Sequence, residues 1–202
     1  MFEKYYKILL EWNNKINLIS RKEENIIERH FLDSILFLPE FENLTHTSPI
    51  PTPIFLLDIG SGGGFPAIPL AIMKPEWTFT LCESIKKKVS FLTHLIEELN
   101  ITNHVTVINN RVESLYSTNQ RQKYDFITAR AVTKMDELIK YSLPLLKKEG
   151  YLLAYKAKDI DDELKNAEDL INKNKLGLTI FEKDLNGVER KIVAITQTTT
   201  QL

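Results

Sequence analysis

Hydrophobic side chains recur every three or four positions near the start of the chain, which is the period of an α-helix with one buried face. The positions on this face are Phe2, Tyr5, Leu9 and Trp12. A second helix should begin at Ser20, because Ser20 followed by Glu23 matches the capping-box pattern. The apolar positions of this second helix continue almost to Pro39. The first forty residues are therefore expected to be helical.

Prolines divide this helical part from the rest of the chain. Three prolines lie between residues 49 and 53, downstream of Pro39, and proline cannot continue a helix interior. We therefore predict an N-terminal helical cap over residues 1–39, a linker over residues 40–53 and a main domain over residues 54–202. The cap and the main domain should form one compact unit.

From residue 54 the pattern changes to short apolar runs that alternate with helical stretches. Five of these runs are expected to be strands, over residues 54–59, 78–82, 105–108, 124–128 and 151–155. Strands that alternate with helices build a parallel sheet. Two further runs, 178–181 and 192–195, are too close for a helical crossover and should pair antiparallel. The expected fold class is α/β, with a seven-stranded, mostly parallel sheet whose last strand is antiparallel.

The composition agrees with an ordinary globular chain of 202 residues, with 43% hydrophobic and 26% charged residues. The single cysteine, Cys82, cannot form an internal disulfide, which favours a reducing compartment. No apolar run approaches the ~20 residues of a membrane span. The N-terminal residues lack the uninterrupted apolar core of a signal peptide. We therefore expect a cytoplasmic protein with no membrane partner.

The charge is unevenly distributed, although the net charge of the whole chain is only −1. Residues 84–158 carry thirteen basic and seven acidic side chains, a net charge of +6. A basic region in a neutral chain is typical of a site for a polyanion. Lysines that only solvate helix faces would give the same count, so charge alone does not decide the function.

A glycine-rich segment, Asp58–Pro66, follows the first predicted strand and precedes a helix, as in a nucleotide-binding loop. Gly60 and Gly62 lack a Cβ, so the backbone there can approach a ligand closely. Glu83 ends the second predicted strand, where a carboxylate can accept hydrogen bonds from ribose hydroxyls. The third glycine, Gly64, is one residue early for the dinucleotide pattern. This spacing favours S-adenosylmethionine, which has no pyrophosphate.

Basic side chains follow three of the predicted strands at their carboxyl ends, where ligands of open α/β sheets bind. Arg111 follows the third strand, Arg130 the fourth and Lys156 the fifth. Three cations at neighbouring strand ends favour a negatively charged substrate. The segment Asn109–Glu113 could also enclose an adenine.

The sequence lacks the groups that several methyl-transfer reactions need. Methylases of exocyclic amines carry an Asn/Asp-Pro-Pro-aromatic segment after the fourth strand, where this chain has Thr128–Ala131. Cys82 precedes Glu83 within a strand and is poorly placed as a nucleophile. Guanine N7 has a free lone pair, so methylation there needs only alignment and no base. The histidines have no metal-ligand spacing, and we assign no metal.

Several motifs together resemble one family. They are the loop Asp58–Pro66, Pro75-Glu76, Arg111-x-Glu113, Thr128-Ala-Arg130 and the segment Arg29-His-Phe-Leu-Asp-Ser34. The family is that of the bacterial 16S ribosomal RNA guanine-N7 methyltransferases, also called glucose-inhibited division protein B. The resemblance implies a Rossmann-like, S-adenosylmethionine-dependent fold with an N-terminal helical extension. It also implies methylation of a guanine in the decoding-centre loop of 16S rRNA, free or in the small ribosomal subunit.

The resemblance also implies roles for individual residues. The implied cofactor contacts are Gly60, Phe65, Val112, Glu113 and Arg130. We expect Arg130 to position the transfer without a general base. The strand-end positions of Arg111 and Lys156 and the net charge of +6 over residues 84–158, rather than the resemblance, indicate that these two residues act mainly on RNA. We also expect the protein to be a monomer.

Two other functions fit parts of the sequence. One is an S-adenosylmethionine-dependent methylase of a small molecule or of a protein, although the basic middle of the chain argues against it. The other is a non-catalytic scaffold that binds RNA or a nucleotide. The glycine loop together with Glu83 argues against a scaffold.

Overall fold

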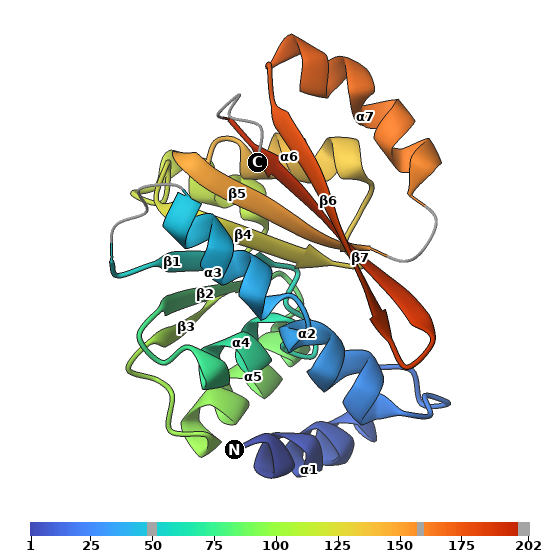
Figure 1. Cartoon of the computed structure of the whole chain (residues 1–202). Helices are drawn as coiled ribbons and strands as arrows, with labels where there is room; N and C mark the ends of the chain where they lie inside the picture. The colour runs from blue at the N-terminus through green and yellow to red at the C-terminus, as the bar shows by residue number, and fades with distance from the viewer. Residues whose placement is uncertain (48–51, 157–159, 198–202) are drawn as a thin grey trace.

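The computed structural model describes residues 1–47, 52–156 and 160–197. Within these ranges seven strands form one sheet, in the order β3–β2–β1–β4–β5–β7–β6 (Figure 1). The strands are β1 (Phe55–Ile59), β2 (Thr78–Glu83), β3 (Val105–Asn109), β4 (Tyr124–Arg130), β5 (Leu146–Lys156), β6 (Gly177–Leu185) and β7 (Val188–Thr196). The pairings of β7 with β5 and with β6 are antiparallel, and the other pairings of the sheet are parallel. The predicted fold class is confirmed.

The helices cover both faces of this sheet. They are α1 (Phe2–Asn13), α2 (Asp33–Ile35), α3 (Leu38–Thr47), α4 (Ala67–Met73), α5 (Lys86–Glu98), α6 (Met135–Ser142) and α7 (Asp161–Lys173). A π-helix, η1 (Ile27–Leu32), leads into α2, and a 3₁₀ helix, η2 (Val112–Ser117), follows β3. No helix within the described ranges has the length and apolar content needed to cross a membrane.

Alternate side chains of each central strand supply two separate cores. Leu56 packs into a core with α1, α3, α4 and α5, whereas Leu57 packs into a core with η2, α6 and α7. This alternation is the two-residue period of a strand that is buried on both faces. The N-terminal helices therefore complete one face of the sheet, as Figure 1 also shows.

The predicted linker over residues 40–53 is wrong in its first eight residues, because these belong to α3. Pro39 lies in the first turn of that helix, where a missing N–H costs no hydrogen bond. Phe41 and Leu44 are buried, and Phe41 packs 5.2 Å from the ring of Phe126. The segment 48–51 lies outside the described residues.

The predicted capping box at Ser20 is also wrong. The amide of Glu23 donates to the carbonyl of Ser20 at 3.1 Å in a turn, and the next helix begins only at Ile27. The carboxylate of Glu23 instead forms an ion pair with Arg29 at 2.7 Å. The side chain of Glu23 therefore pairs with Arg29 in the following π-helix and does not cap a helix that starts at Ser20.

Candidate functional site

The glycine loop connects β1 to α4 at the carboxyl end of the sheet. Gly60 and Gly62 both have positive φ, at 69° and 53°, a conformation that side chains with a Cβ rarely adopt. The amide of Gly60 donates to the carbonyl of Cys82 at the end of β2, at 2.8 Å. The loop is therefore bonded to the neighbouring strand and held close to its end.

Glu83 fixes this loop from the end of β2. Its side chain is buried, and one carboxylate oxygen accepts the amide of Gly62 at 2.9 Å. The other oxygen accepts the amide of Ile85 at 2.9 Å. Each oxygen keeps a second lone pair, so Glu83 can hold the loop and accept ligand hydroxyls together.

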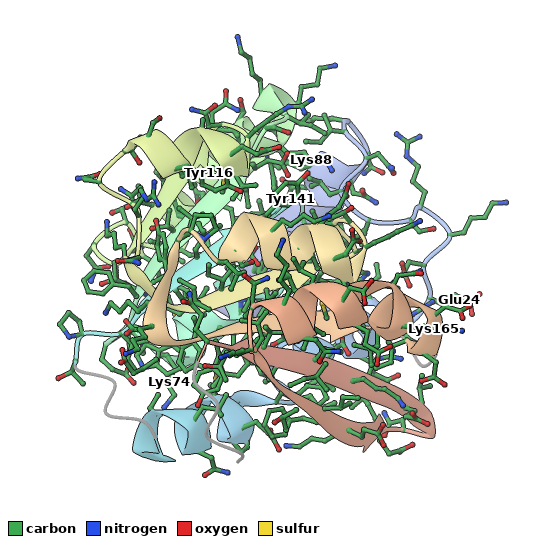
Figure 2. The ribbon with its side chains drawn as sticks, turned by 90° about the horizontal axis from the view of Figure 1, so that it is seen from above. Glu24, Lys74, Lys88, Tyr116, Tyr141 and Lys165 are labelled. Atoms are coloured by element: carbon green, nitrogen blue, oxygen red, sulfur yellow. The ribbon has the colours of Figure 1, made fainter. Side chains whose placement is uncertain are left out.

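A pocket of about 170 Å³ opens beside this loop, and we call it the glycine-loop pocket. Four residues singled out in the sequence line it together: Gly60, Arg111, Val112 and Glu113. Tyr141 of α6 also borders this pocket, and its carbonyl accepts the hydroxyl of Tyr116 at 3.3 Å; both tyrosines are marked in Figure 2. Arg111 thus lies with the residues expected to hold the cofactor.

A larger pocket of about 510 Å³ lies at the ends of β4, β5 and β7, and we call it the cationic pocket. It brings together Arg130 and Lys156, as expected from their strand ends, but not Arg111. The other residues that line it have no role predicted from the sequence; they include Arg29, His30, Asp33, Arg190 and Lys191.

Three of these lining residues belong to a motif that is recognisable in the sequence. Arg29, His30 and Asp33 belong to the Arg-His-Phe-Leu-Asp-Ser segment, which carried the resemblance without a role for each residue. Lys191 pairs with Lys156 in the antiparallel register of β5 and β7. An antiparallel last strand necessarily brings its early residues beside the end of β5.

Ion pairs organise the cationic pocket. The buried carboxylate of Asp33 contacts Arg190 Nε at 2.8 Å and Arg130 Nη2 at 3.3 Å. Lys156 forms an ion pair with Glu163 of α7, and its Nζ lies 3.4 Å from the carbonyl of Thr133. Cations here are therefore already oriented by acidic partners.

Two titratable groups at the site have displaced pKa values. Burial, together with the nearby charge of Arg130, lowers the pKa of His30 to about 4. Burial raises the pKa of Asp58 to about 7, against the hydrogen bond that Thr128 donates at 2.7 Å. His30 is therefore neutral at pH 7, whereas burial favours the protonated form of Asp58.

Phe65 lies away from both pockets. Its ring stacks on Tyr5 at 5.2 Å and packs near Phe31 and His30, at 5.1 Å and 5.0 Å. The side chain of Phe65 thus packs against His30, which lines the cationic pocket. Only its backbone belongs to the glycine loop.

The residues of the glycine-loop pocket fit S-adenosylmethionine. Glu113 offers a carboxylate inside the pocket, and Glu83, which holds the loop beside it, offers a second. Gly62 leaves space where a Cβ would project. Asp58, which precedes the pocket residue Ile59, has a buried Oδ2 with no hydrogen-bond partner among the described residues. The fold and this pocket define an S-adenosylmethionine-dependent methyltransferase.

Solved structures agree with this fold. The N-terminal domain of human METTL16, in complex with SAH, superimposes with a TM-score of 0.66 at 16% identity, covering 82% of this chain and 70% of that chain. A human methyltransferase 10 domain containing protein gives the same TM-score at 14% identity, with 98% of each chain covered.

The family model for rRNA small subunit methyltransferase G, GidB, matches residues 1–193. The chain belongs to this family. The ribosomal RNA small subunit methyltransferase G of Desulforamulus reducens is 41% identical over 172 residues, covering 84% of this chain and 68% of the relative. The protein of the same name from Staphylococcus epidermidis is 38% identical over 200 residues, covering 96% and 80%.

Proposed function

We propose that this protein transfers a methyl group from S-adenosylmethionine to N7 of a guanine in the decoding-centre loop of 16S rRNA. The observation that carries the proposal is that the glycine-loop pocket and the cationic pocket meet at one residue, Val132. The first has the residues for the cofactor, and the second has the charge for RNA. Membership of the methyltransferase G family supports the same reaction.

The cofactor would be held by Gly60, Gly62, Glu83, Val112 and Glu113. When bound, S-adenosylmethionine supplies an electrophilic methyl group on a sulfonium. Glu83 and Glu113 would accept hydrogen bonds from hydroxyl or amine groups, and the glycines would allow close approach of the backbone. We keep Phe65 as a contact through its backbone only.

Guanine N7 loses no proton when it is methylated, so the pocket needs no general base. The task of the protein is to hold the guanine ring in line with the methyl group. Arginine donates well to guanine O6, and Arg130 lies in the cationic pocket at the end of β4. Arg130 would therefore position the base by a charge-assisted hydrogen bond.

Lys156 would bind RNA phosphate or the target base in the same pocket. Arg111 lines the glycine-loop pocket and would contact RNA from there. We further propose that the protein acts as a cytoplasmic monomer on 16S rRNA or on the small ribosomal subunit.

The test is methylation of 16S rRNA and small subunits isolated from cells that lack this gene, with methyl-labelled S-adenosylmethionine. We expect 7-methylguanosine, whose cationic ring makes the strand cleavable after borohydride and aniline treatment. Label on an exocyclic amine, a ribose or a pyrimidine carbon would contradict the N7 reaction. Label in a small molecule or a protein would favour the other methylase, and cofactor binding without any transfer would favour a scaffold.

A further inference from the structure

A single carboxylate from the N-terminal segment, by which we mean residues 1–47, forms ion pairs with two arginines of the sheet. Asp33 of α2 is 5% exposed, and each of its oxygens faces a different guanidinium. Oδ1 lies 2.8 Å from Nε of Arg190 on β7, and Oδ2 lies 3.3 Å from Nη2 of Arg130 on β4. Asp33 therefore bridges two strands that are not adjacent in the sheet.

The same segment holds Arg130 by a second contact. Nη2 of Arg130 also donates to the carbonyl of Arg29, at 2.6 Å. Nη1 is buried and has no hydrogen-bond partner in the part of the chain that the structure describes. One side of the guanidinium is thus fixed by the N-terminal segment, and the donors of Nη1 on the other side have no acceptor among the described residues. A buried arginine donor without a partner is costly, which makes a ligand acceptor the natural complement.

We infer that Asp33 is a positioning residue for methyl transfer, which acts by orienting Arg130 in the cationic pocket. The inference rests on the role of Arg130 in the proposed function. A planar guanidinium presents its donors in a fixed fork, so the partner on one side determines the direction of the donors on the other. The N-terminal segment is then part of the active site and not only a cover for the sheet.

A second ion pair between the N-terminal segment and the sheet provides a matched control. Glu40 of α3 contacts Lys183 of β6 at 2.8 Å, and Lys183 also donates to the carbonyl of Leu36 at 3.0 Å. This ion pair also joins an N-terminal helix to a strand, although it involves one cation where Asp33 has two. Neither Glu40 nor Lys183 lines the cationic pocket or the glycine-loop pocket. If an ion pair between the N-terminal segment and the sheet were sufficient for activity, the loss of Asp33 and the loss of Glu40 would change the methylation rate equally.

The experiment compares Asp33→Asn with Glu40→Gln, using single-turnover methylation at saturating cofactor and RNA. We expect Asp33→Asn to lower the rate by roughly 10- to 100-fold, because small misplacements of a positioning group have effects of this size. Its affinity for S-adenosylmethionine should stay at the wild-type value. Glu40→Gln should keep the wild-type rate, and Asp33→Glu should recover part of it. Equal rates for Asp33→Asn and Glu40→Gln, at equal folded fraction, would overturn the inference.

A double mutant tests the route through Arg130. If Asp33 acts by orienting Arg130, then Asp33→Asn should change the rate less than about twofold when Arg130→Ala is already present. Independent, multiplied losses would show that Asp33 acts otherwise and would overturn the inference. The two hypotheses fail separately: N7 methylation by the wild-type protein tests the proposed function, and the double mutant tests the role of Asp33.

Discussion

Val132 lies against Gly60, so closely that a Cβ built at residue 60 would be 2.8 Å from Val132 Cγ2. Val132 is also the residue that lines both the glycine-loop pocket and the cationic pocket. The contact between the loop after β1 and the loop after β4 is thus the boundary between the two proposed ligands. Changes to the glycine loop should therefore affect the cofactor, and loss of Lys156 on the other side of this boundary should affect RNA.

The first prediction concerns the cofactor side. Gly62→Val places a β-branched side chain where φ is +53°, and Glu83→Ala removes both the anchor of the loop and the acceptor for the cofactor. Loss of hydrogen bonds from a charged group costs about 1.5–3 kcal/mol, which corresponds to roughly 10- to 100-fold weaker binding of S-adenosylmethionine. Titration calorimetry measures this directly.

Glu97→Ala serves as the control for Glu83→Ala, because Glu97 is exposed on α5 and lines neither pocket. It should bind the cofactor as the wild type does. Wild-type affinity in both folded site variants would contradict the placement of the cofactor.

The second prediction concerns the pH dependence of cofactor binding. Burial raises the pKa of Asp58 to about 7, and its Oδ2 lacks a hydrogen-bond partner within the described ranges. A cationic ligand nearby favours the ionised carboxylate and lowers that pKa. Binding should therefore release a proton below about pH 7, and affinity should rise as the pH increases from 6 to 7.5.

Calorimetry in buffers of different ionisation enthalpy measures the proton released. Asp58→Asn should remove this release and flatten the pH dependence. An equally steep pH dependence in the folded asparagine variant would assign the titration to another group.

The third prediction concerns stability at acid pH. The folded-state pKa of His30, about 4, is below its ordinary value of 6.5, so between these values the unfolded chain binds the extra proton. This group therefore contributes stability above pH 6.5, and that contribution is lost as the pH falls toward 4. Thermal melting should show a loss on the order of 3 kcal/mol over this range. His30→Gln should show a smaller loss, and an unchanged profile in this variant would refute the role of His30.

Much of the fold was predictable because its signals are local. The apolar runs of the strands and the glycine loop after β1 can be recognised within a few residues. The helix α3 was missed because Pro39 was interpreted as a break, whereas in the first turn of a helix proline is tolerated. Glu23 was assigned to a cap because its partner Arg29 lies beyond the window of that pattern.

The site residues also differ in whether a local sequence pattern indicates them. Gly60, Val112 and Glu113 follow their strands directly, and the structure brings them together in one pocket. The contact between Asp33 and Arg130 joins residues that are far apart in the chain, and no local pattern indicates it. The separation of Arg111 from Lys156 also depends on three-dimensional structure, because both follow strands and differ only in the place of those strands in the sheet.

The last prediction concerns RNA and the division of work among the cations. Each phosphate contact that is lost should lower the salt slope of RNA binding by about 0.7–0.9, because fewer counterions are released. Lys156→Ala and Arg111→Ala should therefore weaken RNA binding and flatten its salt dependence, with cofactor affinity nearly unchanged. Arg130→Ala should reduce turnover or cofactor binding more than RNA binding. Filter binding across a salt series, combined with calorimetry, separates these effects.

The ion pair between Lys156 and Glu163 sharpens this test, because the lysine must exchange that carboxylate for a phosphate. Glu163→Gln should thus strengthen RNA binding and steepen its salt dependence, the opposite of Lys156→Ala. Lys165→Ala is the control for a general loss of charge, because Lys165 is exposed on α7 and lines neither pocket (Figure 2). A salt slope that falls equally in Lys165→Ala and Lys156→Ala would mean that RNA responds to the overall charge of the protein. Equal loss of cofactor and RNA binding in the Arg111, Arg130 and Lys156 variants would contradict the assigned roles, even with the reaction itself intact.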